Sequence, residues 1–288
     1  MSKIDFVVVG AQKAGTTSLY KILRKHQDIY LPEEKEFHFF DKNPYPQTSQ
    51  IVSYFERFSE AKKQSIKGEI TPDYLFYGYV PENIKKFLGD DIKIIAILRN
   101  PAKRAYSQFN FHRMKGVERT TDFMEIIKEE QINNNVLQYD KWYSPPYYLS
   151  RGMYYNQVSR FINCFGKEKV HVIIFEKLFG ENYNEELEKL LNFIGVNTEF
   201  KQETMHEHPT KLNKSDTLFT LLRMGRWVKN VIGEPIYQKL RVHTLDKIQK
   251  KPPSLSKENE KEIIYEYFLN DIKKLEDLVE KDLKIWYE

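Results

Sequence analysis

The sequence contains very little cysteine and no long uninterrupted hydrophobic segment. Cys164 is its only cysteine, so an internal disulfide is excluded and we expect the chain to work in a reducing compartment. Lysine, aspartate or glutamate interrupts every apolar run well before the roughly 20 residues that a bilayer requires, which argues against a membrane span. Met1 is followed almost at once by the apolar segment Ile4–Val9, which leaves no room for a signal peptide. We therefore expect a cytoplasmic protein.

A large excess of charge of one sign is also missing. The 288 residues include 45 Lys and Arg and 41 Asp and Glu, which are interleaved and give a net charge of +4. A nucleic-acid-binding protein usually concentrates its basic residues in a stripe, and the nearest candidate, Lys239–Lys251, is typical of a solvated helical face. We expect no nucleic-acid partner, although the slight excess of base allows a local pocket for a small polyanion.

What the sequence does contain is the alternation of strands and helices that is typical of an α/β fold. Short runs rich in β-branched residues at Ile4–Val9, Ile94–Leu98 and Val170–Phe175 predict buried strands of a parallel sheet. The segments between and after them predict helices at Thr17–His26, Pro81–Leu88, Pro101–Arg113, Thr121–Gln131, Asn156–Phe165 and Asn184–Ile194. This alternation predicts a three-layer fold, with a central, mainly parallel sheet flanked by helices.

The chain shows no internal repeat and no low-complexity linker, so residues 1–288 are predicted to form a single domain. Its last segment, Ser256–Trp286, carries apolar residues at helical spacing and predicts one long amphipathic helix with Ser256 as the N-cap. Two polar segments, 133–150 and 203–216, interrupt the alternation. Loops of this length in a compact domain are usually functional, so they predict lid or binding loops, with ordinary surface loops as the alternative.

The first local motif is the segment Gly10–Thr17, which directly follows an apolar strand and opens a helix. Its two glycines allow the backbone to curl, so that N–H groups and the helix N-terminus face one anion. A loop that binds nucleoside triphosphates has lysine directly after the second glycine, whereas this loop has Thr16 there and Lys13 in its interior. The strand Ile94–Leu98 is followed by Arg99 rather than by a metal-binding carboxylate. We therefore predict an anion site that works without a metal ion, with a simple glycine-rich turn as the alternative.

The second motif begins at Arg99, at the carboxyl end of a predicted strand, where open α/β sheets place their ligands. Pro101 starts the next helix, and Ser107 lies about two turns along it. A guanidinium suits bidentate capture of a phosphate better than an ammonium does. Arg99 and Ser107 thus predict a second phosphate site, although Arg99 taken alone fits a structural ion pair equally well.

Taken together, these motifs resemble those of sulfotransferases that use 3′-phosphoadenosine 5′-phosphosulfate (PAPS). Gly10–Thr17 is similar to their 5′-phosphosulfate loop, and Leu98–Ser107 is similar to their 3′-phosphate motif. Lys35–Asp41 and Gly68–Tyr74 resemble the carbohydrate branch, which includes heparan sulfate N- and 3-O-sulfotransferases and bacterial relatives. Arg151–Tyr154 fits the same branch, so the resemblance spans essentially the whole chain.

The resemblance implies a P-loop-like fold and an enzyme that moves the sulfuryl group of PAPS to a hydroxyl or amine of a carbohydrate or glycoconjugate by in-line displacement. The product would be adenosine 3′,5′-bisphosphate, and no metal is expected. The residues implied for the nucleotide are Lys13, Ala14, Gly15, Thr16, Thr17, Arg99, Ser107 and, from a late loop, Lys211. Lys13 is expected to stabilise the charge on the leaving 5′-phosphate. The rival functions are a P-loop kinase or NTPase and a non-catalytic protein that binds adenosine bisphosphate.

Two residues compete for the role of general base. The resemblance implies a glutamate at the position of Glu36, and the neighbouring Phe37, Phe39 and Phe40 are apolar surroundings that make a carboxylate more basic. If this segment is extended, Glu36 and His38 share one face. His38 is the rival because cytosolic sulfotransferases that act on small molecules use histidine. We favour Glu36, whose position matches the carbohydrate branch.

The remaining residues implied by the resemblance concern the acceptor. His38 and Asp41 are expected to orient Glu36 or the acceptor sugar, and Tyr154 is expected to contact the acceptor. One position departs from the heparan sulfate enzymes, which carry a lysine where this chain has Ile70. Because isoleucine cannot supply that charge, the departure argues against a heparan-like acceptor.

Overall fold

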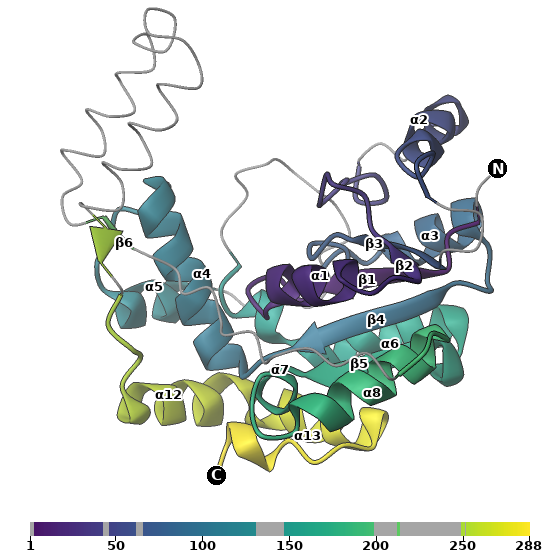
Figure 1. Cartoon of the computed structure of the whole chain (residues 1–288). Coiled ribbons are helices and arrows are strands. Elements are labelled where there is room, and N and C mark those ends of the chain that lie inside the picture. The colour runs from purple at the N-terminus through teal and green to yellow at the C-terminus, as the bar shows by residue number, and fades with distance from the viewer. Residues whose placement is uncertain are drawn as a thin grey trace, which may run out of the picture.

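A computed structural model of the chain describes residues 3–42, 46–61, 66–130, 147–198, 212–213, 249–250 and 252–288. Figure 1 shows a central sheet with helices packed around it. Most of the two predicted lid or binding loops, 133–150 and 203–216, lies outside the described residues. The single-domain organisation stays a prediction. Among the described helices, none combines the length and the apolar composition needed to cross a bilayer.

The central sheet has five strands, all paired in parallel, in the order β2-β3-β1-β4-β5. The strands are β1 (Phe6–Gly10), β2 (Ile29–Tyr30), β3 (Ile66–Ile70), β4 (Lys93–Leu98) and β5 (Val170–Ile174). A separate antiparallel pair joins β6 (Leu212–Asn213) to β7 (Gln249–Lys250). The three predicted strands and the parallel sheet are confirmed. After β1, the chain forms β2 and β3 on one side of β1 and then reverses direction across the sheet to form β4 and β5 on the other side. In such sheets, ligands bind at the carboxyl ends of the strands beside the point of reversal.

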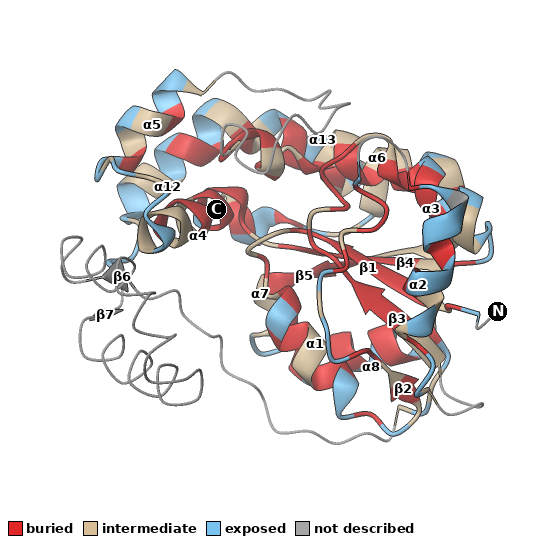
Figure 2. Ribbon diagram, turned by 90° about the horizontal axis from the view of Figure 1, so that it is seen from above, coloured by how far each residue is buried: buried red, intermediate tan, exposed pale blue. Residues whose placement is uncertain are grey.

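The helices cover both faces of the sheet (Figure 2). They are α1 (Thr16–Arg24), α2 (Ile51–Glu56), α3 (Val80–Leu88), α4 (Pro101–Lys115), α5 (Phe123–Glu129), α6 (Tyr154–Phe165), α7 (Phe175–Leu178), α8 (Tyr183–Ile194), α12 (Lys257–Ile263) and α13 (Leu269–Val279). The six helices predicted between Thr17 and Ile194 are confirmed to within two residues at each end. In Figure 2, α1 and α8 lie on one side of the sheet, whereas α3, α6 and α13 lie on the other. The three-layer fold is therefore confirmed.

Strand β1 shows why both faces of the sheet have to be covered. Phe6 and Val8 pack into the core beneath α1 and α8, whereas Val7 and Val9 pack into the core beneath α3, α4, α6 and α13. All four side chains are fully buried. A strand buried on both faces reads as a continuous apolar run rather than as an alternating pattern.

Strand β3 was missed by the sequence analysis because its residues do not look buried. A Cβ atom on Gly68 would lie 2.1 Å from the ring of Phe6, so the ring occupies the space that a side chain would need. Glu69 is 2% exposed and accepts hydrogen bonds from the hydroxyls of Tyr54 at 2.6 Å and Tyr74 at 2.7 Å. Burial raises the pKa of Glu69, and these hydrogen bonds oppose the increase.

The C-terminal segment corrects the prediction of one helix over Ser256–Trp286. Ser256 caps α12 as predicted, since its hydroxyl accepts a hydrogen bond from the Asn259 N–H at 3.1 Å. A π-helical turn over 264–268 then separates α12 from α13, and α13 ends at Val279. Glu280 has a positive φ of 53°, which turns the chain back. Trp286 is thereby buried against the body of the protein, at 2% exposure.

Candidate active site

A cavity of about 600 Å³ opens at the carboxyl ends of β1, β3 and β4. Its wall comes from the loop after β1, the Pro72–Asp73 turn after β3, the Arg99–Phe111 stretch, Phe175, Glu36 and the segment Pro252–Leu255. Residues that the sequence analysis had selected separately therefore meet at one site. They are Lys13, Gly15, Thr16, Thr17, Glu36, Arg99 and Ser107.

The loop after β1 has the backbone geometry of an anion cradle. Lys13 and Gly15 have positive φ values of 67° and 87°. Gly15 is the N-cap of α1, and a Cβ atom there would lie 2.7 Å from the ring of Phe175. The N–H groups of the first helical turn, which includes Thr16 and Thr17, have no partner within the helix. The turn contains no acidic residue, so its dipole favours an anion.

Lys13 is a cation held in surroundings that oppose its charge. Burial, followed by the nearby charge of Arg99, lowers the pKa of Lys13 to about 8. Its ammonium nitrogen lies 4.3 Å from the centre of the Phe111 ring, which also lines the cavity. An anion in the cavity would restore the stability of the charged form.

Arg99 reaches the cavity from the end of β4. Its Nη1 atom donates to the carbonyl of Lys13 at 3.4 Å, and its guanidinium lies 4.6 Å from the centre of the Phe175 ring. On α4, Ser107 belongs to the same wall. Lys103 and Asn110 also line the cavity and were not predicted from the sequence. They lie four residues before and three after Ser107, on one face of the helix.

The turn after Arg99 is held by hydrogen bonds within α4 and by hydrogen bonds to Glu176. The Asn100 side chain caps α4 by accepting from the Lys103 N–H at 3.0 Å. The Glu176 carboxylate accepts from the Asn100 N–H at 2.9 Å and from the indole N–H of Trp286 at 2.8 Å. The end of the chain is thus hydrogen-bonded to the turn that carries Arg99.

Glu36 lies in the cavity wall, but its surroundings differ from those predicted. The segment around it is not extended, since Glu36 and His38 have positive φ values of 65° and 48°. Phe37, Phe39 and Phe40 point into the core and are at most 8% exposed. The Glu36 side chain is 42% exposed, so the prediction of an apolar enclosure is wrong. The Glu36 N–H donates to the carbonyl of Ile70 at 3.2 Å, which fixes the loop against the end of β3.

His38, the rival base, is absent from the lining residues of this cavity. Its Nδ1 atom is hydrogen-bonded to the Asp41 carboxylate at 2.7 Å. Burial lowers the pKa of His38, but the hydrogen bond and charge of Asp41 outweigh this effect, so the pKa is raised. Asp41 is itself 3% exposed, and its carbonyl accepts from the hydroxyl of Tyr79 at 2.8 Å. This pair therefore braces the loop that carries Glu36.

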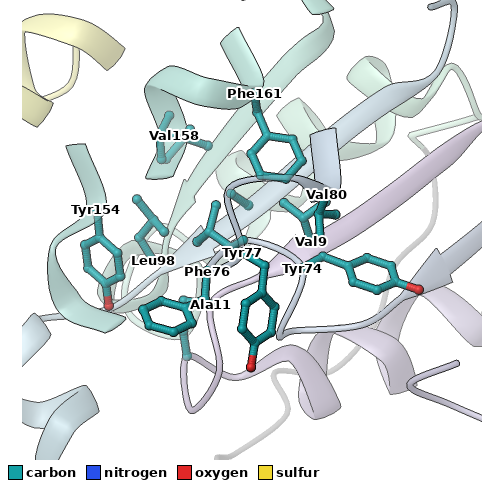
Figure 3. Close-up of a cluster of buried hydrophobic side chains, with 14 of the residues drawn as sticks. Val9, Ala11, Tyr74, Phe76, Tyr77, Val80, Leu98, Tyr154, Val158 and Phe161 are labelled. Atoms are coloured by element: carbon teal, nitrogen blue, oxygen red, sulfur yellow. The ribbon is translucent and has the colours of Figure 1, made fainter. Parts of the chain in front are cut away.

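Two more of the predicted site residues lie outside the cavity wall. Tyr154 is fully buried, as Figure 3 illustrates, and its hydroxyl donates to the carbonyl of Arg99 at 3.0 Å. Tyr154 thus supports the turn that carries Arg99 from the buried side, whereas a contact with the acceptor was expected. Ala14 is fully buried in the core, and its N–H donates to the Ala11 carbonyl at 3.1 Å. Lys211 lies outside the described residues.

An ion pair beside the cavity was not anticipated from the sequence. Asp73 lines the cavity, and its carboxylate accepts from Arg151 Nη1 at 2.6 Å. The Arg151 guanidinium lies 4.4 Å from the centre of the Phe76 ring, which belongs to the cluster of buried hydrophobic side chains in Figure 3. Each residue belongs to a motif noted in the sequence, but they are 78 positions apart. Only the fold shows that the two motifs meet.

Lys35 is a further residue whose role was not predicted from the sequence. Its ammonium nitrogen donates to Thr17 Oγ1 at 3.0 Å and to Glu36 Oε1 at 2.9 Å. The Lys35 side chain is 16% exposed. Within the described ranges, no cluster of three or more His, Cys, Asp or Glu side chains is arranged to hold a metal ion; the absence of a metal stays a prediction.

A comparison of the sequence with known families gives a match to the family described as "Sulfotransferase domain" over residues 3–220. The chain belongs to the sulfotransferase domain family. The recognition from the phosphate-loop, Arg99 and Glu36 motifs is thereby confirmed.

Several sulfotransferases resemble this family member in sequence or structure. The membrane-associated sulfotransferase kil1 of Dictyostelium discoideum is 30% identical over 131 residues, which are 44% of this chain and 28% of kil1. The bifunctional heparan sulfate N-deacetylase/N-sulfotransferase 1 of Xenopus laevis is 28% identical over 200 residues, 66% of this chain and 22% of that protein. The chain thus spans less than a third of the length of either relative. A crystal structure of a sulfotransferase from Alicyclobacillus acidocaldarius has a TM-score of 0.68 at 25% identity and covers 99% of both chains.

Proposed function

We propose that this sulfotransferase-family protein transfers the sulfuryl group of PAPS to a hydroxyl or amine of a carbohydrate or glycoconjugate. The observation that carries the proposal is the single cavity whose wall includes Lys13, Arg99, Ser107 and Glu36. Lys13, Arg99 and a helix N-terminus suit a nucleotide with two anionic groups, and the carboxylate of Glu36 suits proton removal.

The lining residues fit a nucleotide that carries anions at both its 5′ and 3′ positions. The desolvated ammonium of Lys13 and the first turn of α1 suit the 5′ group. Arg99 and Ser107, from the neighbouring strand end and helix, suit the 3′-phosphate. When bound, PAPS supplies an activated sulfuryl group attached to a phosphate that leaves.

In this proposal, the residues of the chain act on the two ends of the displacement. Glu36 accepts the proton of the acceptor hydroxyl or amine. Lys13 neutralises the charge that grows at the 5′ end of the nucleotide. His38 is the poorer candidate because it does not line the cavity and its Nδ1 atom is hydrogen-bonded to the Asp41 carboxylate at 2.7 Å. Most of the rate enhancement then comes from positioning and electrostatics.

The lining residues also favour sulfuryl transfer over a kinase or NTPase reaction. Thr16 occupies the position of the lysine that a nucleoside-triphosphate loop requires. A phosphoryl group bears several charges that metal ions neutralise, whereas a sulfuryl group bears fewer, and Lys13 with the first turn of α1 suffices to hold it.

The acceptor class is inferred from two observations. The names of several relatives, including the Xenopus laevis protein, specify heparan sulfate. In this chain, however, Ile70 is 3% exposed and packs in the core beside Phe6 and Val8. A heparan-like polyanion is therefore disfavoured, and we propose a different carbohydrate or glycoconjugate as the acceptor.

The test is incubation of the full chain with ³⁵S-labelled PAPS and a panel of neutral glycans, glycolipids, heparosan and phenols. We expect label on a neutral glycan or glycolipid rather than on heparosan, and no hydrolysis of ATP with Mg²⁺. Labelling of phenols alone would overturn the carbohydrate assignment, and Mg²⁺-dependent ATP turnover would favour the kinase or NTPase. Tight binding of adenosine 3′,5′-bisphosphate without transfer to any acceptor would favour the non-catalytic alternative.

A further inference from the structure

Lys35 connects two walls of the cavity that have different tasks. Its ammonium contacts Thr17, in the first turn of α1, and Glu36, in the loop after β2. Thr17 and Glu36 both line the cavity, whereas Lys35 does not. Lys35 therefore acts from behind the wall, through the two residues to which it is bonded.

The contact with Thr17 fixes the direction of a hydroxyl group. An ammonium has three donors and no acceptor, so the Thr17 oxygen must accept the hydrogen bond from Lys35. The hydroxyl hydrogen of Thr17 is then free to point toward another acceptor. Since Thr17 lines the anion cradle, its hydroxyl is set up to donate to an anion there.

The contact with Glu36 compensates the negative charge of a carboxylate that lines the same cavity as the anion cradle. The carboxylate shares a cavity with the anion cradle of Lys13 and α1. Its negative charge would therefore repel an anion bound in the cradle. Lys35 holds one carboxylate oxygen, Oε1, at 2.9 Å, which leaves the other free to accept a proton. The neighbouring Arg57 does not share this task, because its guanidinium pairs with Glu34 at 2.6 Å.

We propose that Lys35 is a positioning residue that makes an anion cradle and a carboxylate base compatible within one cavity. It orients the Thr17 hydroxyl as a donor and neutralises Glu36. This inference rests on the proposed function, because it assigns the cradle to the 5′ group of the nucleotide. Lys35 would act on the nucleotide and the acceptor only through Thr17 and Glu36.

The experiment is calorimetric titration of the full chain with adenosine 3′,5′-bisphosphate. Lys35→Met should weaken binding about tenfold, which corresponds to the loss of one hydrogen bond from Thr17 to the charged nucleotide. In a Thr17→Val background, which has no hydroxyl to orient, the same substitution should cost less. Adding Glu36→Gln to Lys35→Met should restore part of the affinity, since the uncompensated carboxylate is then gone.

The controls separate this inference from a general loss of structure. Lys35→Arg keeps the charge and can still donate to both Thr17 and Glu36, so it should bind nearly as well as the wild type. Lys25→Met, at an exposed position at the far end of α1, should have no effect. A loss that is equal in all backgrounds, or no loss at all, would overturn the role of Lys35. Failure of the wild-type protein to bind the nucleotide would instead overturn the proposed function.

Discussion

At the scale of single residues, Lys13 combines a functional advantage with a cost in stability. Its pKa of about 8 lies below the usual 10.5. Below pH 8 the lysine is charged in both the folded and the unfolded state, and the charge destabilises the folded state. Lys13→Met should therefore raise the free energy of unfolding at pH 7 by about 1–3 kcal/mol, while binding of adenosine 3′,5′-bisphosphate is lost. The stability difference should shrink between pH 8 and 10.5, as the wild type loses the proton. Urea denaturation at pH 7 and 10 measures both effects, and a less stable variant at pH 7 would contradict them.

The same lysine should make nucleotide binding depend on pH. An anion favours the ammonium form, so binding above pH 8 has to draw a proton onto Lys13. We expect the affinity for adenosine 3′,5′-bisphosphate to fall as the pH rises past 8, with net proton uptake. Calorimetry at pH 8.5 in buffers of different ionisation enthalpy measures that uptake. No difference between the buffers would argue against a Lys13 contact with the nucleotide.

The two candidate bases can be separated by a pair of conservative substitutions. Glu36→Gln should reduce the transfer rate by about 100-fold or more, since it removes the proton acceptor while leaving nucleotide binding in place. His38→Gln should have a smaller effect, because His38 acts through its 2.7 Å contact with Asp41. Initial rates with ³⁵S-labelled PAPS and the acceptor found in the panel provide the measurement. The opposite order of effects would assign the base to His38.

At the scale of the elements, the turn between β1 and α1 depends on a missing side chain. Gly15→Ala adds the cost of a left-handed residue, about 1 kcal/mol, to a clash with Phe175 at 2.7 Å. We expect a total loss of about 2–4 kcal/mol in stability and a marked loss of nucleotide affinity. Gly195→Ala is the matched control, because Gly195 is also left-handed and meets only the end of Lys93, at 3.4 Å. Equal losses for the two variants would show that the contact with Phe175 is unimportant.

The elements also show where sequence reasoning succeeds and where it stops. Strands β1, β4 and β5 are apolar apart from Lys93 and His171, and such runs between two layers of helices can be recognised in a sequence. Strand β3 cannot be recognised in this way, because the space at Gly68 is filled by Phe6 and the charge of Glu69 is met by hydroxyls. The predicted C-terminal helix is interrupted by a π-helical turn and ends early. Neither feature has a clear local signal.

For the site, Lys13, Arg99 and Glu36, which follow directly from a strand end or a loop motif, line one cavity, and their roles stay predictions. Prediction failed where the role depends on neighbours distant in the sequence. The aromatic residues after Glu36 were expected to enclose it, but positive φ values in that loop turn them into the core. Tyr154 was expected at the acceptor and instead supports Arg99 from below. The position of Lys35 is likewise visible only in three dimensions.

At the scale of the whole molecule, Glu69 ties global stability to pH. Burial raises its pKa above 4.5, and three hydrogen bonds oppose the shift. Protonated Glu69 therefore adds stability below pH 4.5, and this contribution is lost as the pH rises through the raised pKa. The stability advantage of the wild type over Glu69→Gln should accordingly decline with rising pH. Glu185→Gln should show a small opposite trend, since the hydrogen bond with Lys189 lowers the pKa of the exposed Glu185. Urea denaturation from pH 4 to 8 measures both slopes, and a Glu69 slope of the opposite sign would contradict the burial argument.

The tie between Trp286 and the Arg99 turn has a consequence for how the protein is made. Pro252–Leu255 forms part of the cavity wall, and Glu176 bonds both to Trp286 and to Asn100 beside Arg99. Because synthesis runs from the N-terminus, the sheet and the phosphate loop emerge from the ribosome before these late residues do. A nascent chain therefore carries its anion cradle with one wall still missing, and the cavity is completed only after the segment from Pro252 to Trp286 has been made.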